Sequence, residues 1–543
     1  MPLFFSLVLI VGMVLGFKLR DSLRNKRDIS TIVKRNDRLE ELIELIKERY
    51  VDTVNTDLLY QDAVTGILDP LDPHTVYISA EDARIANSEL DGGFSGIGVE
   101  FSIMHDTVNV TSVTENGPAA KAGMVSGDQL IKVGDSVVAG TRITSERIMA
   151  LLRGRQGSNV SITIRPIAYE GSRTVQVTRD MIPLYSVDAN IMLDSRTGYI
   201  KVDRFSATTY EEFTKALAEL KKEGATQLIV DLRDNRGGYL DAATSISDEL
   251  LDNDKLIVST RGRHTPRIDH SAKEKGAFES GKLIVLVNES SASASEVLAG
   301  AVQDWDRGLI IGRRTYGKGL VQEQYEMPDG AALRLTIARY YTPSGRSIQR
   351  SFSEGRDVYN EDLENRLLDG ELTGKEQVRP ADTTPYHTAK GRLVYGGGGI
   401  TPDVYVPYDT ARWSDPLFKR AFSDEMRQAI HDHYVRNRDL LSYSSIQDFT
   451  RAFNGEDKII SNYIGLLPPD EQRQVAKHIT VQGSNKLFRT QIKAQLARYL
   501  FRDNGYYSIR LREDAMVNKA LSIINGTQYD AILNGQRIIA QNK

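Results

Sequence analysis

The chain has 543 residues, of which 40% are hydrophobic and 26% charged, a balance typical of globular proteins long enough for several domains. Its formal net charge of −4 does not favour a nucleic-acid partner, and we expect none. The absence of cysteine excludes disulfides, thiolate catalysis, cysteine-ligated metals and a lipid-modified N-terminal cysteine.

Residues 2–17 form an uncharged, strongly apolar run, and basic residues follow it from Lys18 onward. The run is somewhat short for a spanning helix of roughly 17–25 residues, and no basic residue precedes it as in a signal peptide. Taken alone, the charge bias favours a cytoplasmic body. A start upstream of Met1 with basic residues would reverse that bias, and we expect an exported body. Because no small-x-small cleavage site stands out, we predict an uncleaved membrane anchor at residues 1–17.

Helices are predicted for the N-terminal part, where apolar residues recur at intervals of three or four over residues 34–50. Two prolines within residues 69–74 predict a loop. From Gly92 onward the pattern favours short strands, with one helix at residues 145–152. These segments predict an N-terminal helical cap at residues 30–93 and a β-rich module at residues 94–180.

Beyond Gly198, short apolar strands alternate with helices, as in a sheet that is buried on both faces. The strands are expected at residues 228–230, 283–287 and 309–311. A longer strand is expected at residues 333–341, a charged excursion rich in chain breakers at 354–390, and a returning strand at 400–406. We assign this α/β core to residues 181–412. Residues 413–543, where apolar positions recur every fourth residue, are predicted to be a C-terminal helical extension.

Residues 283–300 predict a strand, a turn and a helix, with Ser293 in the turn. A serine beside a helix N-terminus lies close to free N–H groups and to the positive end of the helix dipole, which favour a developing negative charge. This position suits a nucleophile and its oxyanion. The alternative is that Ser290 or Ser291 only caps the helix, with Glu296 in its first turn.

A serine nucleophile needs a base, and the eight histidines offer no obvious one within the strand–helix core. Lysine is the other choice, because burial can lower its pKa enough for it to accept a proton. Lys318 lies between two glycines that let the backbone turn sharply into a crowded site, although it could also be an ordinary solvated lysine. Gly237 and Gly238 follow a buried strand, where they either bring an N–H to an oxyanion or form a plain turn.

Several motifs, in a common order, resemble the carboxyl-terminal processing proteases, which are tail-specific serine peptidases. The motifs are LDPLDPHTVYIS, GGFSGIGVEF, SSASASEVLAGAVQDW, GRRTYGKGLVQ, DGAALRLTIARYYTPSGRSIQ and GGITPDV. The resemblance covers roughly residues 38–407. It implies that Ser293 is the nucleophile, that Lys318 is the general base and that Gln322 orients the lysine.

The same resemblance implies that the oxyanion donors are the N–H groups of Ala294 and of Gly237 or Gly238. It also identifies residues 94–180 as a PDZ domain, a module that captures a peptide C-terminus on successive amides while the peptide adds as a strand. The loop that would bind the carboxylate consists of Gly96, Ile97, Gly98 and Val99. Arg153 either links the PDZ domain to the core or is a plain surface arginine.

The predicted fold is therefore α+β and multidomain, with a crotonase-like α/β protease core, an inserted PDZ domain, a helical N-terminal cap and a helical C-terminal extension. The resemblance implies a serine endopeptidase that recognises the C-terminal tails of proteins and works through an acyl-enzyme, without a metal or organic cofactor. The expected partners are protein or peptide substrates with free C-termini and a membrane at the N-terminal segment. A second copy of the chain or a regulatory partner is left open. We expect the bacterial inner membrane, with the catalytic body in the periplasm.

Two other functions compete with this one. A binding scaffold could use the PDZ domain while the protease site is silent, but intact Ser293, Lys318 and Gln322 argue against it. An acyl-CoA enzyme could share the crotonase fold in outline. Such enzymes do not use a Ser–Lys dyad, however, and a PDZ domain has no role in them.

Overall fold

The computed structural model describes residues 38–167, 171–376 and 382–536. The chain divides into two compact units, residues 1–72 and 73–543. In the first unit, the helices α2 (Arg38–Arg49) and α3 (Thr56–Leu68) contain no buried residue. Within the described residues, no helix combines the length and apolar composition that a membrane span requires. The anchor expected at residues 1–17 lies outside the described residues.

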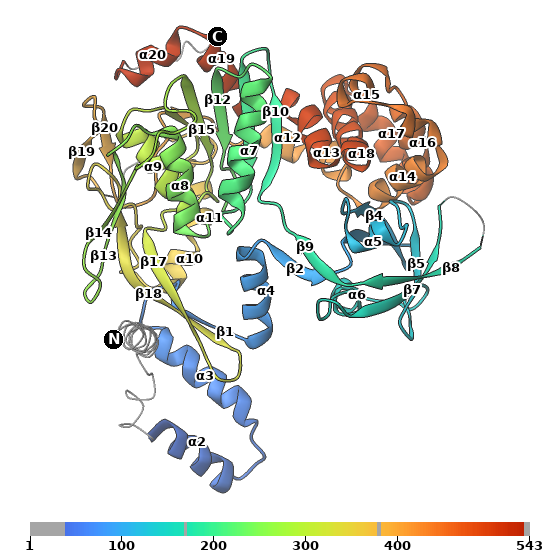
Figure 1. Ribbon diagram of the computed structural model, residues 1–543, viewed down its shortest axis with the longest axis horizontal. Helices are drawn as coiled ribbons and strands as arrows, with labels where there is room; N and C mark the ends of the chain where they lie inside the picture. Colours follow the sequence, from blue (N-terminus) through green and yellow to red (C-terminus); the bar gives the residue numbers. More distant parts are fainter. Residues whose placement is uncertain (1–37, 168–170, 377–381, 537–543) are drawn as a thin grey trace, which may run out of the picture. The chain divides into compact units, whose positions relative to one another are not determined.

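A six-stranded sheet forms the centre of the second unit (Figure 1). Only its first strand runs antiparallel to its neighbour, and the others are parallel. The order across the sheet is β10 (Val187–Met192), β11 (Thr197–Val202), β12 (Gln227–Asp231), β15 (Lys282–Val287), β16 (Leu309–Gly312) and β21 (Val404–Tyr405). The last of these is shorter than the strand expected at residues 400–406.

Both faces of the central sheet are buried, which explains why its strands are continuously apolar. Val230 and Val285 are paired and belong to the core on one face, whereas their neighbours Ile229 and Ile284 are paired and belong to the core on the other. The first face is covered by α7 (Thr209–Lys222), α8 (Leu240–Leu250) and α9 (Ala294–Asp304). The second is covered by α19 (Ala515–Asn525) and α20 (Gln528–Leu533).

A second sheet of this unit carries segments that are far apart in the sequence. Its strands are β1 (Val76–Ile78), β18 (Ala332–Tyr341), β13 (Leu256–Arg261), β14 (Ile268–Ser271) and β17 (Leu320–Glu326), with β17 paired to β18. The excursion expected at residues 354–390 contains α10 (Arg356–Asn360) and α11 (Asp362–Leu368). The hairpin of β19 (Pro385–His387) and β20 (Leu393–Tyr395) follows these two helices.

Residues 94–180, which we expect to be the PDZ domain, contain an antiparallel sheet with its own apolar core. Its elements are β3 (Val99–Met104), β4 (Thr107–Val113), α5 (Pro118–Lys121), β5 (Gln129–Val133), β6 (Ser136–Val137), α6 (Ser145–Leu152), β7 (Asn159–Arg165) and β8 (Arg173–Thr178). The sheet is entered and left through a two-stranded ribbon of β2 (Gly93–Gly96) and β9 (Asp180–Pro183). The helix α4 (Ala80–Leu90) precedes this ribbon.

The C-terminal tail divides between two cores. Buried side chains from Leu417 to Ile509 share one apolar cluster, whereas α19 and α20 pack on the central sheet. The first group comprises α13 (Pro416–Arg420), α14 (Asp424–Arg436), α15 (Ile446–Ala452), α16 (Glu456–Leu466), α17 (Pro469–Ile479) and α18 (Gln482–Arg510). A break interrupts α18 at Arg502, whose φ of 55° and ψ of −150° lie outside the helical region.

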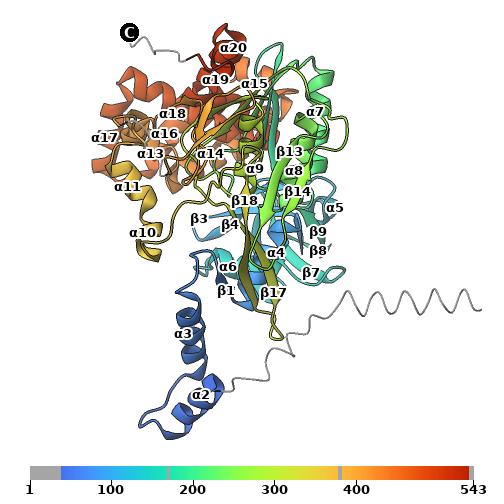
Figure 2. The same ribbon diagram turned by 90° about the vertical axis from the view of Figure 1, so that its left-hand side faces the viewer.

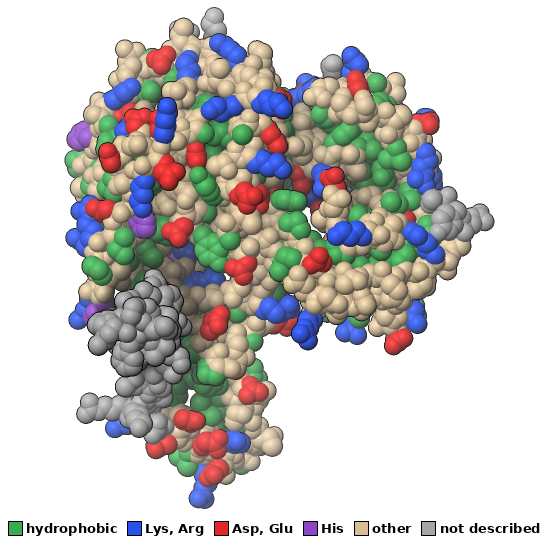
Figure 3. Space-filling view, viewed as in Figure 1, with side chains coloured by type: hydrophobic (Ala, Val, Ile, Leu, Met, Phe, Trp, Pro, Cys, Tyr) green, Lys and Arg blue, Asp and Glu red, His purple; other side chains and the backbone are tan. Residues whose placement is uncertain are grey.

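Charged side chains of both signs are interspersed over the face of the molecule that is drawn in Figure 3. This distribution agrees with the small net charge of −4. A partner that approached this face would therefore meet local charges rather than one broad electrostatic field.

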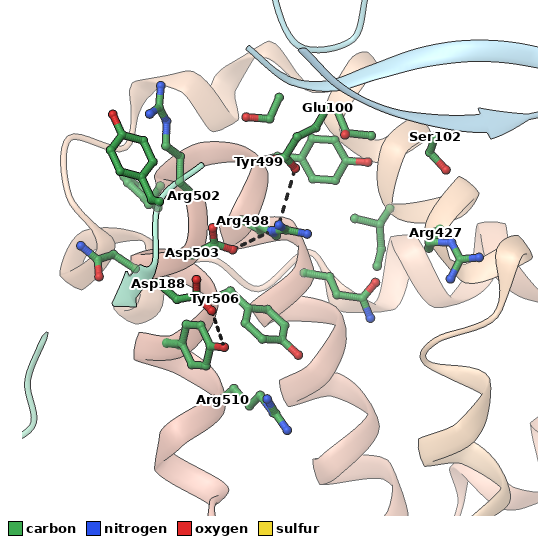
Figure 4. Close-up of a pocket in the computed structure, with 18 of the residues that line it drawn as sticks. Glu100, Ser102, Asp188, Arg427, Arg498, Tyr499, Arg502, Asp503, Tyr506 and Arg510 are labelled. Atoms are coloured by element: carbon green, nitrogen blue, oxygen red, sulfur yellow. Dashed lines mark hydrogen bonds and ion pairs between the residues drawn. The ribbon is translucent and has the colours of Figure 1, made fainter. Parts of the chain in front are cut away.

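A cavity of about 970 Å³ lies where the predicted PDZ domain, the central sheet and the helical tail meet (Figure 4). Its walls come from β3, β4, residues 183–188, α14 and α18. Arg498 of α18 reaches toward Glu100 of β3 at 3.5 Å and pairs with Asp503 at 2.9 Å. Arg502 donates to the carbonyl oxygen of Val113 at 3.3 Å. The contact between the predicted PDZ domain and the helical tail therefore combines these arginines near the break in α18 with an apolar contact, in which Ile167 packs against the apolar cluster of the tail.

Asp188 lies in the wall of this cavity (Figure 4). The hydroxyl of Tyr507 donates a hydrogen bond to its carboxylate at 3.3 Å. Burial raises the pKa of Asp188 to about 6, and the nearby carboxylates of Asp203 and Asp503 add to the effect. Lys201 and Arg204 act in the opposite direction. In the folded protein the carboxyl group of Asp188 therefore remains protonated at a pH where an ordinary aspartate, with a pKa of 3.8, is ionised.

The raised pKa of Asp188 predicts how stability changes with pH. Because the folded state binds the proton more tightly, the contribution of Asp188 to stability is present at low pH and is lost as pH rises from about 4 through 6. Asp188→Asn keeps the shape of the side chain and removes its charge, so at pH 8 it should raise the free energy of unfolding by on the order of 2 kcal/mol. The thermal unfolding midpoint at pH 8 should rise by several degrees as a result. The gain should shrink toward pH 5, as measured by calorimetry.

The matched control is Asp135→Asn, because Asp135 is an exposed carboxylate beside β6. Its removal should shift the midpoint little at either pH. An Asp188→Asn gain that is equal at pH 5 and pH 8 would contradict the assignment.

Candidate active site

Ser293 lies between the carboxyl end of β15 and the first residue of α9. Its backbone has a φ of 57° and a ψ of −115°, a combination that is unfavourable for residues other than glycine. Such strain persists only where the surroundings enforce it, and it is concentrated at functional sites. The side chain is 7% exposed, so it lies at the surface of a packed region rather than in open solvent.

Hydrogen bonds from neighbouring loops enforce the conformation of Ser293. The N–H of Ala292 donates to the carbonyl oxygen of Asn235 at 3.0 Å. The hydroxyl of Ser295 donates to the same oxygen at 2.9 Å. Ser291 donates to the carbonyl oxygen of Leu232 at 2.7 Å, so it secures the turn, and the residue at the cap position is Ser293. The loop after β12 thus holds the turn after β15 from both sides.

Lys318 lies in the segment between β16 and β17 and is half-buried. Its Nζ donates a hydrogen bond to Oε1 of Gln322 at 2.7 Å, so the structure brings these two predicted site residues together. The preceding Gly317 has a φ of 88°, and a Cβ there would lie only 3.0 Å from the backbone at Gly398 and Gly399. Glycine is therefore required where this segment turns.

Glu296 connects the serine turn to the lysine segment. Its side chain is 0% exposed, and its two carboxylate oxygens accept four hydrogen bonds. Oε2 accepts from the N–H groups of Ser293 at 2.9 Å and Lys318 at 2.8 Å. Oε1 accepts from the Thr315 hydroxyl at 2.5 Å and the Gly317 N–H at 2.8 Å. The backbone nitrogens of Ser293 and Lys318 therefore bind one and the same oxygen atom.

The pKa of Glu296 reflects two opposing influences. Burial raises it, and the hydrogen bonds from Thr315, Lys318, Gly317 and Ser293 lower it in part. All four partners are donors, which is the arrangement that an ionised carboxylate requires.

The two glycines after β12 pack directly against the serine turn. A Cβ on Gly237 would lie 2.8 Å from both the Ala292 carbonyl oxygen and Ser293 Cβ. The Gly237 N–H donates to Oδ1 of Asn235 at 2.9 Å, so that donor is occupied. The N–H groups of Gly238 and Ala294 have no acceptor among the residues that the structure describes. These two amides are therefore the ones available to an incoming oxygen.

Tyr340 of β18 approaches the serine from the second sheet. Burial raises the pKa of Tyr340, and a hydrogen bond with the Ser293 side chain acts in the opposite direction. Sequence reasoning did not identify this residue, because a tyrosine within a long strand carries no local signal of a site.

The loop predicted to bind a carboxylate lies between β2 and β3, with Gly96 ending the first strand and Val99 beginning the second. Ile97 points into the apolar core of this domain, and its carbonyl oxygen accepts from the Ala119 N–H at 2.8 Å. Gly98 has a φ of 76°, which favours glycine. The guanidinium of Arg153 lies 4.6 Å from the ring centroid of Phe94 in β2, so this arginine contacts the ribbon between domain and core.

None of the predicted site residues lines the cavity that contains Asp188, so the serine–lysine region is a separate site. Among the described residues, no group of three or more histidine or acidic side chains is placed to hold a metal ion.

Comparisons with known proteins identify the family and the PDZ domain. The family model described as peptidase family S41 matches residues 196–355, and that of the PDZ domain matches residues 95–166. A carboxy-terminal-processing protease of Bartonella bacilliformis is 33% identical over 356 residues, which span 63% of this chain and 81% of the relative. The carboxy-terminal processing protease CtpA of Bacillus subtilis is 32% identical over 331 residues, 61% of this chain and 70% of the relative.

Among solved structures, a photosystem II D1 C-terminal processing protease is 30% identical and aligns over 57% of this chain and 89% of its own, with a TM-score of 0.32. The S41 match covers both Ser293 and Lys318, and the PDZ match covers the loop from Gly96 to Val99. The alignments with the two curated relatives, over 356 and 331 residues, are longer than either match. The chain belongs to the carboxy-terminal processing proteases of peptidase family S41, with a PDZ domain.

Proposed function

We propose that this protein is a serine endopeptidase that recognises the C-terminal tails of its protein substrates, with Ser293 as the nucleophile and Lys318 as the general base. The observation that carries the assignment is the buried Glu296 carboxylate, which binds the backbone N–H groups of both residues. The strained backbone of Ser293 at a helix N-terminus supports the same role. An acyl-CoA enzyme gains no support from the family to which the chain belongs.

In the proposed reaction, the neutral Nζ of Lys318 takes the proton from Ser293 Oγ as that oxygen attacks the scissile carbonyl carbon. The N–H groups of Ala294 and Gly238 donate to the oxyanion, and Gly237 could join only if its N–H left Asn235. The lysine then returns the proton to the leaving amine, which departs with the C-terminal product. A water molecule next gives a proton to Lys318 as it attacks the acyl carbon, and Lys318 returns that proton to Ser293 Oγ as the bond to the acyl group breaks and the new carboxyl terminus departs.

The dyad predicts a clear set of activities. Ser293→Ala and Lys318→Ala should each abolish cleavage of an unfolded protein substrate, because one removes the nucleophile and the other the base. Gln322→Ala should reduce kcat less completely, since Gln322 makes no bond to the substrate. The wild-type rate should rise with pH as the amine loses its proton.

The control is the circular dichroism spectrum, which should be unchanged in all three variants. Labelling with a fluorophosphonate, mapped by mass spectrometry, separates an enzyme from a binding scaffold. Modification at Ser293 supports the enzyme, and cleavage by Ser293→Ala at the wild-type rate would end the dyad assignment.

We also propose that the PDZ domain reads a free C-terminus through the amides of the loop from Gly96 to Val99. Hydrogen bonds to a charged carboxylate are worth roughly 1.5–3 kcal/mol each. Amidation of a substrate's C-terminus should therefore weaken cleavage about tenfold or more, as measured by kcat/KM on matched free and amidated peptides. Equal cleavage of the two peptides would reject recognition of the C-terminus.

For location, we propose an uncleaved anchor at residues 1–17 in a bacterial inner membrane, with the catalytic body in the periplasm. Its support is the apolar run of residues 2–17. Full-length protein should sediment with membranes after carbonate washing, and a variant without residues 1–17 should be soluble and active. A full-length protein that is soluble without cleavage would contradict the anchor, and C-terminal reporter fusions would decide the side.

The finer fold assignment belongs to the proposal as well. Alternation of β11, α7, β12, α8, β15, α9 and β16 supports a crotonase-like core. The helices α2, α3 and α4 support a helical segment before the PDZ domain. An experimental structure of the core, superimposed on a crotonase, would test the assignment of a crotonase-like core. Light scattering would test whether a second copy of the chain associates.

A further inference from the structure

Gln322 is held at both ends of its side-chain amide. Oε1 accepts a hydrogen bond from Lys318 Nζ at 2.7 Å, and Nε2 donates to the backbone carbonyl oxygen of His74. A carbonyl oxygen only accepts, so it selects the amide orientation in which Nε2 faces His74 and Oε1 faces the lysine. With the amide reversed, the Nε2–H of Gln322 would donate to the Lys318 amine and would occupy the nitrogen lone pair that a general base needs. The position of His74 therefore decides whether Gln322 supports or blocks the base.

The His74 ring is fixed by Tyr359, a residue 285 positions away in the sequence. His74 Nε2 and the Tyr359 hydroxyl share a hydrogen bond of 2.7 Å. Their rings also pack edge to face, with centroids 5.4 Å apart. Tyr359 is 3% exposed and belongs to α10, which is visible with α11 in Figure 2. Burial raises the pKa of Tyr359 to about 12, so its hydroxyl stays protonated.

Tyr359 is in turn clamped by Arg350. The guanidinium carbon of Arg350 lies 3.7 Å from the ring centroid of Tyr359 and 4.3 Å from that of Tyr316. The same guanidinium pairs with Asp362 of α11 at 2.5 Å. The N–H of Arg350 donates to the Gly317 carbonyl oxygen at 3.0 Å, directly before Lys318. The excursion that contains α10 and α11 is thus connected to the lysine segment by backbone and side-chain contacts.

We propose that Tyr359 is a positioning residue for the base: through His74 it holds Gln322 in the orientation that leaves the Lys318 lone pair directed at Ser293. The inference rests on the proposed function of the dyad. Tyr359 does not reach the reacting atoms. Correct folding of residues 354–374 onto His74 becomes a condition for proteolysis, so this excursion acts as a structural part of the active site.

The test is Tyr359→Phe, which removes the hydroxyl and keeps the ring against Arg350. We expect kcat for a peptide substrate to fall about three- to tenfold, the range for one buried hydrogen bond, with KM unchanged. The rate of Ser293 labelling by a fluorophosphonate should fall by the same factor. Tyr210→Phe is the matched control. Tyr210 lies on α7, outside the site, and its hydroxyl also donates a 2.7 Å hydrogen bond, in this case to Glu249 of α8. This control should keep the wild-type kcat.

A double-mutant cycle separates positioning from a general structural effect. If Tyr359 acts through Gln322, the Tyr359→Phe change should have no further effect on kcat in a Gln322→Ala background. An equal loss in both backgrounds, or an unchanged kcat for Tyr359→Phe alone, would overturn the inference. Failure of the dyad itself is distinguishable, since Lys318→Ala would then retain activity whatever Tyr359 does.

Discussion

The carboxylate of Glu296 is fully buried, and each of its two oxygens accepts two hydrogen bonds. The donors come from two separate segments of the chain. Burying such a charge is costly unless every lone pair finds a donor. The serine turn and the segment from Thr315 to Lys318 supply those donors together, so neither can move without leaving the charge uncompensated. One buried group thereby sets the spacing between the proposed nucleophile and the proposed base.

The strained backbone of Ser293 is held in place by the loop after β12. The turn adopts an unfavourable backbone conformation, and the loop holds it through the carbonyl oxygens of Leu232 and Asn235. The close approach needs glycine at Gly237 and Gly238, because a side chain would collide with the turn or with Phe205. Two neighbouring parallel strands end at this edge of the sheet, as is common for sites on α/β folds. The sheet thus supplies a rigid support for a locally strained turn.

Contacts between the domains are of a different kind. The central sheet and its helices are joined by extended apolar cores, whereas the PDZ domain meets the helical tail through Arg498, Arg502 and the single apolar side chain of Ile167 around a cavity. Exposed ion pairs of this type contribute little stability and are screened by salt. The PDZ domain is also connected through a ribbon of only two strands. The PDZ domain therefore has an apolar core of its own and shares neither of the cores that join the central sheet to its helices.

Local patterns were enough to predict much of this protein. Continuous apolar runs predicted the buried strands β12, β15 and β16, because a strand covered on both faces must be apolar throughout. The sequence also shows Glu296 in the first turn of the helix, but there it indicated only the alternative of a helix capped by Ser290 or Ser291. The tail was less predictable, since α19 and α20 have the same periodicity as the other helices yet pack on the central sheet. Periodicity reports that a helix has an apolar face and does not report which core that face joins.

The convergence of four donors on Glu296, and the chain from Tyr359 through His74 to Gln322, were decided by the tertiary structure alone. His74 and Tyr359 each occupy a segment that looks like an ordinary loop or excursion, and they are 285 positions apart. A hydrogen bond between such residues leaves no periodic or compositional trace, because its geometry exists only after both segments have packed against the same sheet. The sequence by itself determined the type of fold, the family and the candidate nucleophile and base, since those depend on local patterns and motifs. Their mutual orientation depends on contacts between distant segments, and folding alone creates those contacts.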